Sequence, residues 1–392
     1  MSTIRIGKPY LTETAQTVRL NAKISLSGFD WGGDEKVLWV EAERTYGRHF
    51  IADRADAFLL GFVHYALRYG SEIVCEAPVS ERLYEQLVNQ FLPWHLAAFK
   101  QTTVRKQPLP IKITAATVPE LEVPGTAVGA ACSCGVDSMH VFATCSDITH
   151  AVVWNMHPGA YGCTSAEREV AWESLKARCR AFAETIGKPL ICLDTNYDTA
   201  LFPEMWSDVQ FTWANLFAIR TLQGFLGKFY LASGNPIWTL RMDISPWRCC
   251  CSYEPVLLPC LSASGPLLQL VGAGLARREK LRIIADYPPA RKYLFVCRAH
   301  GQDNCTAYCE KCQETLLQME VAGVVDRFSE VFDVERFHRR HDDFLVFYLT
   351  YVNHYTATDL VDLKPFLRWK IPLVVYLRWI ASRIADRLFH HQ

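Results

Sequence analysis

The chain has 392 residues, of which 50% are hydrophobic and 15 are cysteines, and its 41 lysines and arginines balance 41 aspartates and glutamates. This composition excludes a largely disordered chain, and the length favours two domains or one large α/β domain with an appended piece. A formal net charge of zero provides no overall basic field, so we expect no stable nucleic-acid partner.

Neither end of the sequence has the pattern of a membrane segment. Residues 1–17 mix charged and small polar residues without a continuous apolar stretch, which argues against a secretory signal. Residues 371–385 are apolar but contain Pro372, Arg378 and Arg383, and the stretch is too short to span a bilayer. We therefore expect a cytoplasmic protein without a transmembrane segment, whose cysteines serve metal or thiol chemistry rather than disulfides.

Residues 1–120 are expected to form an N-terminal α+β module. Runs of β-forming residues at 37–40 and 111–115 predict strands. Between them, one helix is expected to begin near Asp53 and end at Gly70, and another to begin after Ser80. No group of catalytic side chains gathers in this part of the sequence.

Residues 121–325 are expected to form a nucleotide-binding domain. A proline-punctuated boundary at 119–124 is followed by strands that alternate with helices, which is typical of parallel βαβ units. Regular periodicity fades over 235–274, and this segment is interpreted as a functional lid or loop. The expected strands lie at 127–131, 151–154, 189–193 and 229–232, the helices at about 139–146, 165–186, 206–226 and 276–286, and a helical extension at 326–392.

The first expected strand of this domain leads directly into Ser133-Cys134-Gly135-Val136-Asp137-Ser138, which precedes a helical pattern. Small residues at such a turn let backbone N–H groups approach an anion, and the helix N-terminus adds its dipole. Ser133 and Ser138 can add hydroxyl donors, and Asp137 can orient the turn or hold Mg²⁺. A plain turn is the alternative, and the strand and helix around it favour the anion site.

This loop resembles the Ser-Gly-Gly-x-Asp-Ser signature of the N-type ATP pyrophosphatases, the PP-loop superfamily. The resemblance implies a parallel-sheet domain of the adenine nucleotide α-hydrolase type that binds ATP and Mg²⁺, with Ser133, Gly135, Asp137 and Ser138 gripping the departing pyrophosphate. Cys134 stands where the family usually has a glycine, and its side chain can change the turn. The nucleotide-binding residues so implied are Ser133, Cys134, Gly135, Val136, Asp137, Ser138 and, through their main chain over the adenine, Val153 and Trp154.

Arg277 and Lys280 lie three residues apart on one face of an expected helix. The resemblance implies that they neutralise phosphate charge, which makes them catalytic candidates together with Asp137 and Ser138. A solvated basic helix face is the alternative that the spacing leaves open.

Four cysteines follow within a short polar stretch, and their spacing suits a tetrahedral zinc site. His300 can replace one of the thiolates. The group resembles the zinc site of the 7-cyano-7-deazaguanine synthase branch of the superfamily, although the gap between the second and third cysteines is one residue longer here. A site closed by four thiolates implies a structural role for Zn²⁺. The four residues are Cys297, Cys305, Cys309 and Cys312.

These features predict an AMP-forming ligase or synthase. A carbonyl or carboxylate oxygen of a small molecule would attack the α-phosphorus of ATP, and a nitrogen nucleophile would then displace AMP. Sulfur transfer from a sulfur donor is the alternative second step, suggested by Cys132, Cys134 and the run at 249–251. A catalytically degenerate nucleotide-binding module is a further alternative, suggested by Cys134 in place of glycine. A homo-oligomer is compatible with the sequence.

Overall fold

The computed structural model divides the chain into two compact units. The first unit comprises Met1–Cys132, Cys145–Pro158 and Leu175–Ala273, and the second comprises Ser133–Thr144, Gly159–Ser174 and Gly274–Gln392. Each unit therefore combines segments that are distant in sequence. The structure describes residues 2–29, 35–100, 108–121, 125–156, 165–197, 211–243, 250–297, 303–306, 309–354, 358–367 and 370–389.

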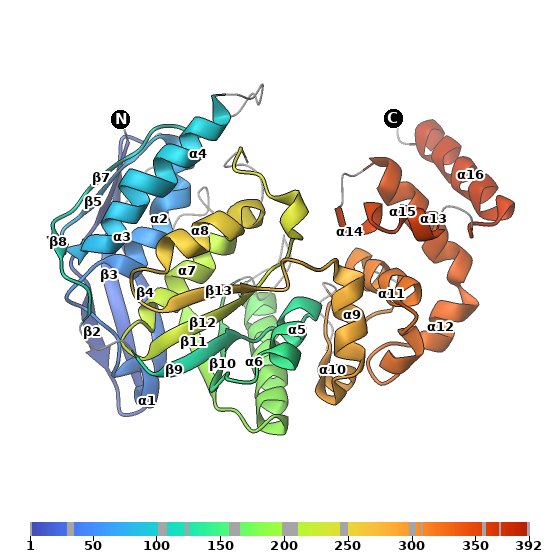
Figure 1. Cartoon of the computed structure of the whole chain (residues 1–392), viewed down its shortest axis with the longest axis horizontal. Coiled ribbons are helices and arrows are strands. Elements are labelled where there is room, and N and C mark those ends of the chain that lie inside the picture. The colour runs from blue at the N-terminus through green and yellow to red at the C-terminus, as the bar shows by residue number, and fades with distance from the viewer. Residues whose placement is uncertain are drawn as a thin grey trace. The chain divides into compact units, whose positions relative to one another are not determined.

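Within the described residues of the first unit, five parallel strands are hydrogen-bonded in the order β13-β12-β9-β10-β11. Figure 1 shows these strands with the helices around them. The first of them in sequence, β9, is central, and the chain winds to one side over β10 and β11 and to the other over β12 and β13. The carboxyl end of β9 is therefore a topological switch point, where open α/β sheets place ligands. The predicted α/β class with a parallel central sheet is confirmed. The bounds are β9 (Ala127–Ala131), β10 (His150–Trp154), β11 (Leu190–Thr195), β12 (Leu226–Ala232) and β13 (Leu267–Val271).

The N-terminal strands extend the same sheet. Strand β4 pairs antiparallel with β11, placing Val40 opposite Thr195, and the sheet continues as β4-β3-β1-β5-β7 with β2 alongside β3. It thus has 11 strands among the described residues. The expected boundary near residue 120 therefore falls inside one sheet. The bounds are β1 (Thr3–Ile6), β2 (Tyr10–Glu13), β3 (Thr17–Ser27), β4 (Lys36–Glu43), β5 (Glu72–Cys75) and β7 (Lys112–Thr114), and β6 (Val79–Ser80) pairs with β8 (Thr117–Val118) in a small second sheet.

Helices α2 and α7 pack against each other in the core of the first unit. Helix α2 ends at Gly70, whose left-handed φ of 65° confirms the predicted stop. Asp53 does not cap this helix, because its carboxylate pairs with Arg54 at 2.9 Å and the helix begins at Asp56. The bounds are α1 (Arg44–Gly47), α2 (Asp56–Tyr69), α3 (Glu81–Glu85), the π-helix η1 (Gln86–Phe91), α4 (Leu92–Phe99), α7 (Phe211–Thr221), η3 (Ile237–Thr239), η4 (Cys250–Tyr253) and α8 (Glu254–Leu261), while α6 (Ser165–Thr185) belongs to both units.

Two local features distinguish the structure from the sequence expectation. The segment 235–274, expected as an irregular lid, contains α8 and the fifth parallel strand β13, which is short and lies between Gly265 and Gly272. Strand β9 is built from small residues because its neighbour approaches closely. A Cβ atom at Gly129 would lie 2.7 Å from the ring of Phe229 in β12.

The second unit is helical, as expected for the last third of the chain. Helix α5, which follows β9 in sequence, packs on α9, and α9 packs on α10 and α11. Helix α13 contacts both α11 and α16. The bounds are α5 (Val136–Thr144), α9 (Arg277–Ala285), α10 (Pro288–Tyr293), α11 (Glu310–Ala322), η5 (Val325–Phe328), α12 (Val334–Arg339), α13 (His341–His354), α14 (Thr358–Val361), α15 (Lys364–Leu367) and α16 (Leu373–Phe389).

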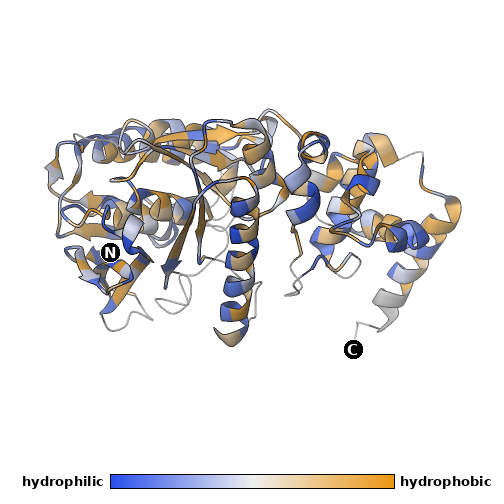
Figure 2. Cartoon of the chain, turned by 90° about the horizontal axis from the view of Figure 1, so that it is seen from below, coloured by the Kyte–Doolittle hydropathy of each residue, from blue (hydrophilic) through white to orange (hydrophobic). Residues whose placement is uncertain are grey.

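Helix α16, which ends near the C label, carries both hydrophobic and charged residues (Figure 2). At the start of the helix the two faces differ: Val375 is completely buried, whereas Val374 is 53% exposed and Leu373 is 74% exposed. None of the helices in the described ranges combines the length and hydrophobicity that crossing a bilayer requires.

Candidate active site and metal centre

The turn between β9 and α5 is held by its own hydroxyl groups. The N–H of Gly135 donates to Ser133 Oγ at 3.3 Å, and the Ser133 hydroxyl donates to Ser138 Oγ at 3.2 Å. Ser138 in turn donates to the carbonyl of Gly135 at 3.1 Å. The two serines singled out from the sequence therefore fix the shape of the turn that opens α5 at Val136.

Cys134 adopts the backbone conformation that usually calls for glycine. Its φ is 57°, in the left-handed region that side chains with a Cβ disfavour by about 1–2 kcal/mol. The Cys134 side chain is almost completely buried. The backbone carbonyl of Cys134 accepts the N–H of Phe295 at 2.8 Å. The cysteine thus keeps the turn that a glycine at this position would make.

Asp137 lies at the start of α5 between two cations from α9. One carboxylate oxygen accepts a bond from Arg277 Nη1 at 2.7 Å, and the other accepts one from Lys280 Nζ at 2.8 Å. The Lys280 side chain is 2% exposed, against 13% for Arg277 and 21% for Asp137. Burial alone would raise the pKa of Asp137, but the two cations outweigh it and hold the pKa below its usual range.

Helix α9 is fixed at the end that carries these cations. The carboxylate of Glu279 accepts the N–H of Ala276 at 2.7 Å, which satisfies a backbone donor just before the first turn. Two cations share one carboxylate here, so the trio of Asp137, Arg277 and Lys280 retains one positive charge. A net positive charge beside a helix N-terminus favours the binding of an anion.

His140, one turn after Asp137 on α5, was not singled out from the sequence. It is buried, and burial together with the nearby Lys280 lowers the pKa of its imidazole, although Asp137 acts in the opposite direction. Because His140 follows Asp137 by three residues on a helix, the sequence spacing could have indicated that the two side chains lie on the same face.

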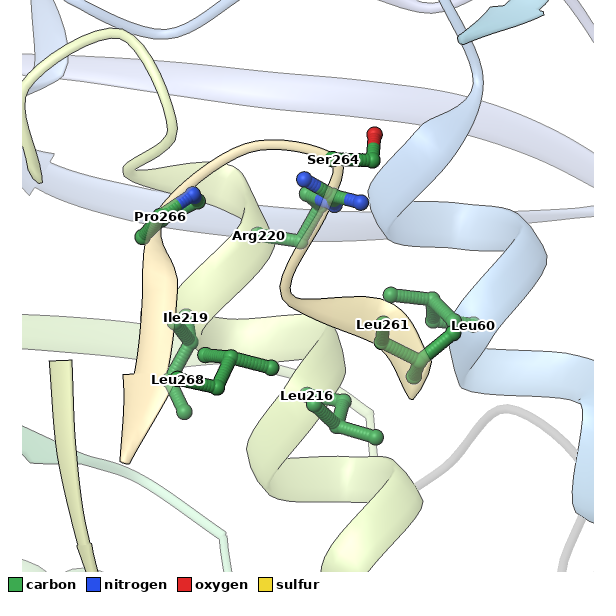
Figure 3. Close-up of a pocket in the computed structure, with 8 residues that line it drawn as sticks. All are labelled: Leu60, Leu216, Ile219, Arg220, Leu261, Ser264, Pro266 and Leu268. Carbon is green, nitrogen blue, oxygen red and sulfur yellow. The ribbon is translucent and has the colours of Figure 1, made fainter. Parts of the chain in front are cut away.

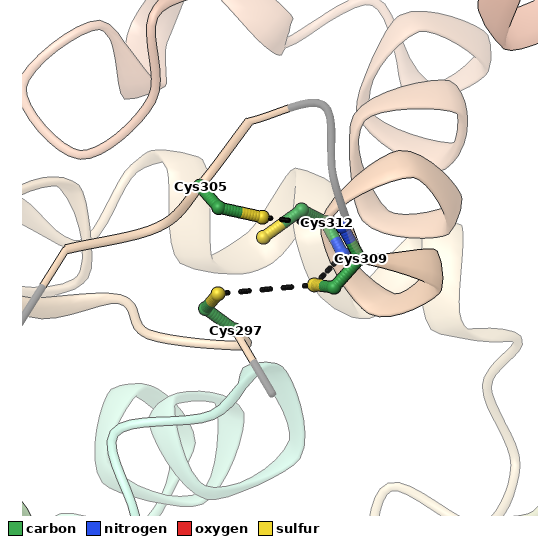
Figure 4. Close-up of side chains that lie close together, drawn as sticks. All are labelled: Cys297, Cys305, Cys309 and Cys312. Atoms are coloured by element: carbon green, nitrogen blue, oxygen red, sulfur yellow. Dashed lines mark hydrogen bonds between the residues drawn. The ribbon is translucent and has the colours of Figure 1, made fainter. Parts of the chain in front are cut away.

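The four cysteines predicted to bind zinc come together (Figure 4). Their Sγ atoms all lie within 4.8 Å of one another. The sulfur atoms of Cys297 and Cys309 are 3.8 Å apart, which matches the edge of about 3.8 Å for a tetrahedron with Zn–S bonds of about 2.3 Å. A hydrogen bond with Cys309 and burial raise the pKa of the Cys312 thiol, so a cation is required for all four groups to ionise together.

Backbone donors and the partly buried amide of Asn304 shape this group of cysteines. The N–H of Cys309 donates to Cys305 Sγ at 3.3 Å, and the N–H of Cys312 donates to Cys309 Sγ at 3.4 Å as α11 begins. Asn304 accepts the N–H of Val296 at 2.9 Å and donates to the carbonyl of Leu294 at 2.9 Å. The sulfur atoms are therefore placed by a folded loop rather than by chance proximity.

The group of four cysteines is linked to the turn before α5 by three residues of chain. Phe295 donates its N–H to Cys134, and Cys297 is two residues further on. A metal held by Cys297 would therefore restrain the segment that supports the turn. The sequence did not indicate this connection, because the Phe295 contact is made by the backbone.

Other predicted site residues lie elsewhere. Val153 and Trp154 are in β10 of the first unit with buried side chains, and their main-chain contact with adenine stays a prediction. His300 and Cys249 lie outside the described residues. Of the cysteine run, Cys250 is buried, and its sulfur accepts the N–H of Thr212 at 3.2 Å.

Comparison of the chain with protein-family models, with curated proteins and with solved structures finds no match. The geometry of the chain itself is therefore the basis for a proposal about its function.

Proposed function

We propose that the chain binds ATP at the 133–138 loop and splits it into AMP and pyrophosphate while it activates a small molecule. The observation that carries the proposal is the pairing of Asp137 with Arg277 and Lys280 at the N-terminus of α5. This helix follows the switch-point strand β9, so a cationic helix N-terminus comes at the place in the chain where α/β folds bind phosphates.

The pyrophosphate part of ATP would be bound by backbone amides of the loop and by the positive charge from α9. Both oxygens of Asp137 already accept bonds from cations, which favours an orienting role for this carboxylate over direct binding of Mg²⁺. Magnesium would accompany the triphosphate and supply charge neutralisation. Arg277 and Lys280 would stabilise the negative charge that develops on the departing pyrophosphate.

The reaction would proceed in two displacements. An oxygen of the substrate attacks the α-phosphorus, the bond to the bridging oxygen breaks, and pyrophosphate leaves. A nitrogen nucleophile then attacks the activated carbon, AMP leaves with the bonding electron pair, and the nitrogen loses a proton to solvent. Positioning and charge neutralisation would supply most of the catalysis.

For the second step, the burial of two cysteines at the loop favours a nitrogen nucleophile over a sulfur donor. Cys132 and Cys134 are 3% and 1% exposed, and buried thiols in such surroundings are unreactive toward external disulfides or persulfides. Zinc would have a structural role, because four thiolates leave no open position for a substrate.

Product analysis tests the proposal. The protein is incubated with Mg²⁺, ATP and a small-molecule extract, and the expected nucleotide products are AMP and pyrophosphate. The variant Arg277→Gln is expected to form AMP more slowly by on the order of 100-fold. Arg278→Gln changes the neighbouring residue, which contacts the ring of Phe366 and not Asp137, and is expected to retain the rate. Formation of ADP, or ATP that binds but stays intact, would overturn the proposed chemistry and favour a binding module.

A further inference from the structure

The space beside Arg220 in the first unit is too small for an organic ligand. It is lined mainly by apolar side chains (Figure 3), and it admits about one water molecule. Exposed apolar side chains gather instead on helix α16 of the second unit. Neither the group of four cysteines nor the proposed nucleotide chemistry uses this helix.

Four large apolar side chains form an exposed stripe along α16. Their successive spacings of four, three and four residues place them within about 60° of one another around a helix of 3.6 residues per turn. Their exposed fractions range from 45% to 74%. Single exposed apolar residues are common on protein surfaces, but a continuous stripe indicates a binding face. The four residues are Leu373, Leu377, Ile380 and Ile384.

The opposite side of α16 is occupied within the second unit, where the helix contacts α13. Val375 lies about 200° around the helix from Leu373 and is completely buried. An ion pair between Arg378 and Asp343 of α13 joins the two helices. The helix is therefore attached to its unit by one side, and the stripe on the other side is open to a partner.

The stripe lies in a basic segment of a chain that is neutral overall. Residues 364–392 contain six lysines and arginines and one aspartate, although the formal net charge of the whole chain is zero. Lys364 and Lys370 lie just before α16 and are exposed. On the helix itself, Arg378 and Arg383 lie on the two sides of the stripe, between it and the buried side. An apolar stripe with flanking cations is complementary to a surface that is apolar below and anionic at its edge.

We propose that α16 docks on an anionic lipid membrane and lies in the plane of its interface. The stripe enters the boundary between headgroups and acyl chains, while Lys370 and Arg383 extend to the lipid phosphates. Each cation near such a surface raises the affinity by about fivefold. The helix does not cross the bilayer, because its 17 residues span about 26 Å and the hydrocarbon core is about 30 Å thick.

A second copy of this chain is a less favourable occupant of the stripe. In a symmetric pair, the same surface of each copy faces the other. Pairing through the stripe would bring together two segments that each hold six cations and one carboxylate, and like charges oppose association. An anionic membrane attracts the same charges.

Co-sedimentation of the intact protein with lipid vesicles tests the proposal. Vesicles in which about one third of the lipid is phosphatidylserine are compared with vesicles of phosphatidylcholine alone. We expect binding to the anionic vesicles to be stronger by on the order of 10-fold or more, and to weaken between about 0.1 M and 1 M salt. The measurement is made without ATP, so its result does not depend on the proposed nucleotide chemistry.

The variant Leu377→Gln removes an apolar side chain from the middle of the stripe. We expect it to bind anionic vesicles about 10-fold more weakly than wild type, because one leucine no longer leaves water. Its unfolding midpoint should be unchanged, since the Leu377 side chain is 58% exposed. The matched control is Leu267→Gln in β13, where the leucine is 45% exposed and the vesicle affinity should not change.

Three results would overturn the proposal. The first is equal binding, or none, to the two kinds of vesicle. The second is an unchanged affinity of Leu377→Gln for anionic vesicles. The third is a vesicle-free dimer of the wild-type protein that Leu377→Gln converts to a monomer, because that result would assign the stripe to a second copy of the chain.

Discussion

Lys280 and Asp137 are 2.8 Å apart, although only 2% of the Lys280 side chain is exposed and 143 residues separate the two in sequence. A buried ammonium group depends on its partner, because water cannot replace the lost carboxylate. The same contact joins α9 to the first turn of α5. Folding of the second unit and the electrostatics of its proposed phosphate site thus depend on one carboxylate.

Replacing Asp137 with asparagine should destabilise the protein by about 3–5 kcal/mol, because Lys280 and Arg277 would keep their charges without a counter-ion. Urea unfolding followed by circular dichroism measures the change. The matched control is Asp286→Asn, which breaks a 2.6 Å pair with Arg327 in which both side chains are exposed. That loss should stay below about 1 kcal/mol. Similar losses for both variants would contradict the buried role of Asp137.

The pairing of Asp137 also predicts how stability depends on pH. The two cations hold the pKa of the folded-state carboxyl below its unfolded value of about 3.9, despite the opposing effect of burial. The stabilisation is therefore complete above that unfolded value and is lost as the pH falls below it toward the folded pKa. Urea titrations between about pH 5 and pH 3 should give a steeper loss of stability for wild type than for Asp137→Asn. Parallel curves would contradict the pKa assignment.

At position 134, glycine should be more stabilising than alanine, whereas at an ordinary buried position alanine is the more stabilising residue. Because the φ of Cys134 is 57°, the Cys134→Gly variant is expected to be more stable than Cys134→Ala by about 1 kcal/mol. The control is Ala130→Gly in β9, a buried position with strand conformation, where the change from alanine to glycine should cost about 1 kcal/mol. The unfolding midpoints of wild type, Cys134→Gly, Cys134→Ala and Ala130→Gly measure these differences. A Cys134→Gly variant less stable than Cys134→Ala would contradict the left-handed backbone assignment.

The proposed zinc site predicts a selective loss of zinc in Cys309→Ser. Atomic emission should find about one zinc per wild-type chain and much less in this variant, together with a lower melting temperature. Cys145→Ser serves as the control, since Cys145 is not among the four grouped thiols. A chelator should lower the melting temperature of wild type but leave that of Cys309→Ser unchanged. Full zinc occupancy in Cys309→Ser would remove the four-thiolate assignment.

Two adjacent valines test how α16 is docked. Val375 is fully buried, so Val375→Ala should cost about 2 kcal/mol. Val374 is 53% exposed, and Val374→Ala should change the free energy of unfolding by no more than about 0.5 kcal/mol. Guanidinium unfolding of both variants measures the contrast. Equal losses would mean that α16 is covered on both sides in solution.

Much of the sheet could be predicted from local pattern. The expected strand at 127–131 coincides with β9, and the expected helix at 165–186 is followed by Gly187, whose left-handed φ of 65° is typical of a helix end. These features are local, since small or β-forming runs and left-handed glycines act over a few residues. Strand β13 was missed because a stretch of five residues between irregular segments is too short to show a recognisable alternation of apolar and polar residues.

The site was only partly predictable for the same reason. The four cysteines are close in sequence, so their spacing alone indicated that they meet. Arg277 and Lys280 were assigned to phosphate, and their pairing with Asp137 could not be derived, because no local pattern specifies contacts between α5 and α9. The contact of Phe295 with Cys134 could not be predicted either, because a hydrogen bond between backbone groups does not depend on the residue types.

The junction of β4 with β11 determines how the chain can be divided. Trp39 donates its N–H to Asn196 at 2.9 Å and accepts the hydroxyl of Thr195 at 2.6 Å, while Asn196 donates to the carbonyl of Val37. A fragment that began at residue 121 would expose the unpaired edge of β11, a surface on which other chains can add as strands. Such a fragment is prone to aggregate, so the N-terminal strands are a protective cover for the parallel sheet as well as part of its architecture.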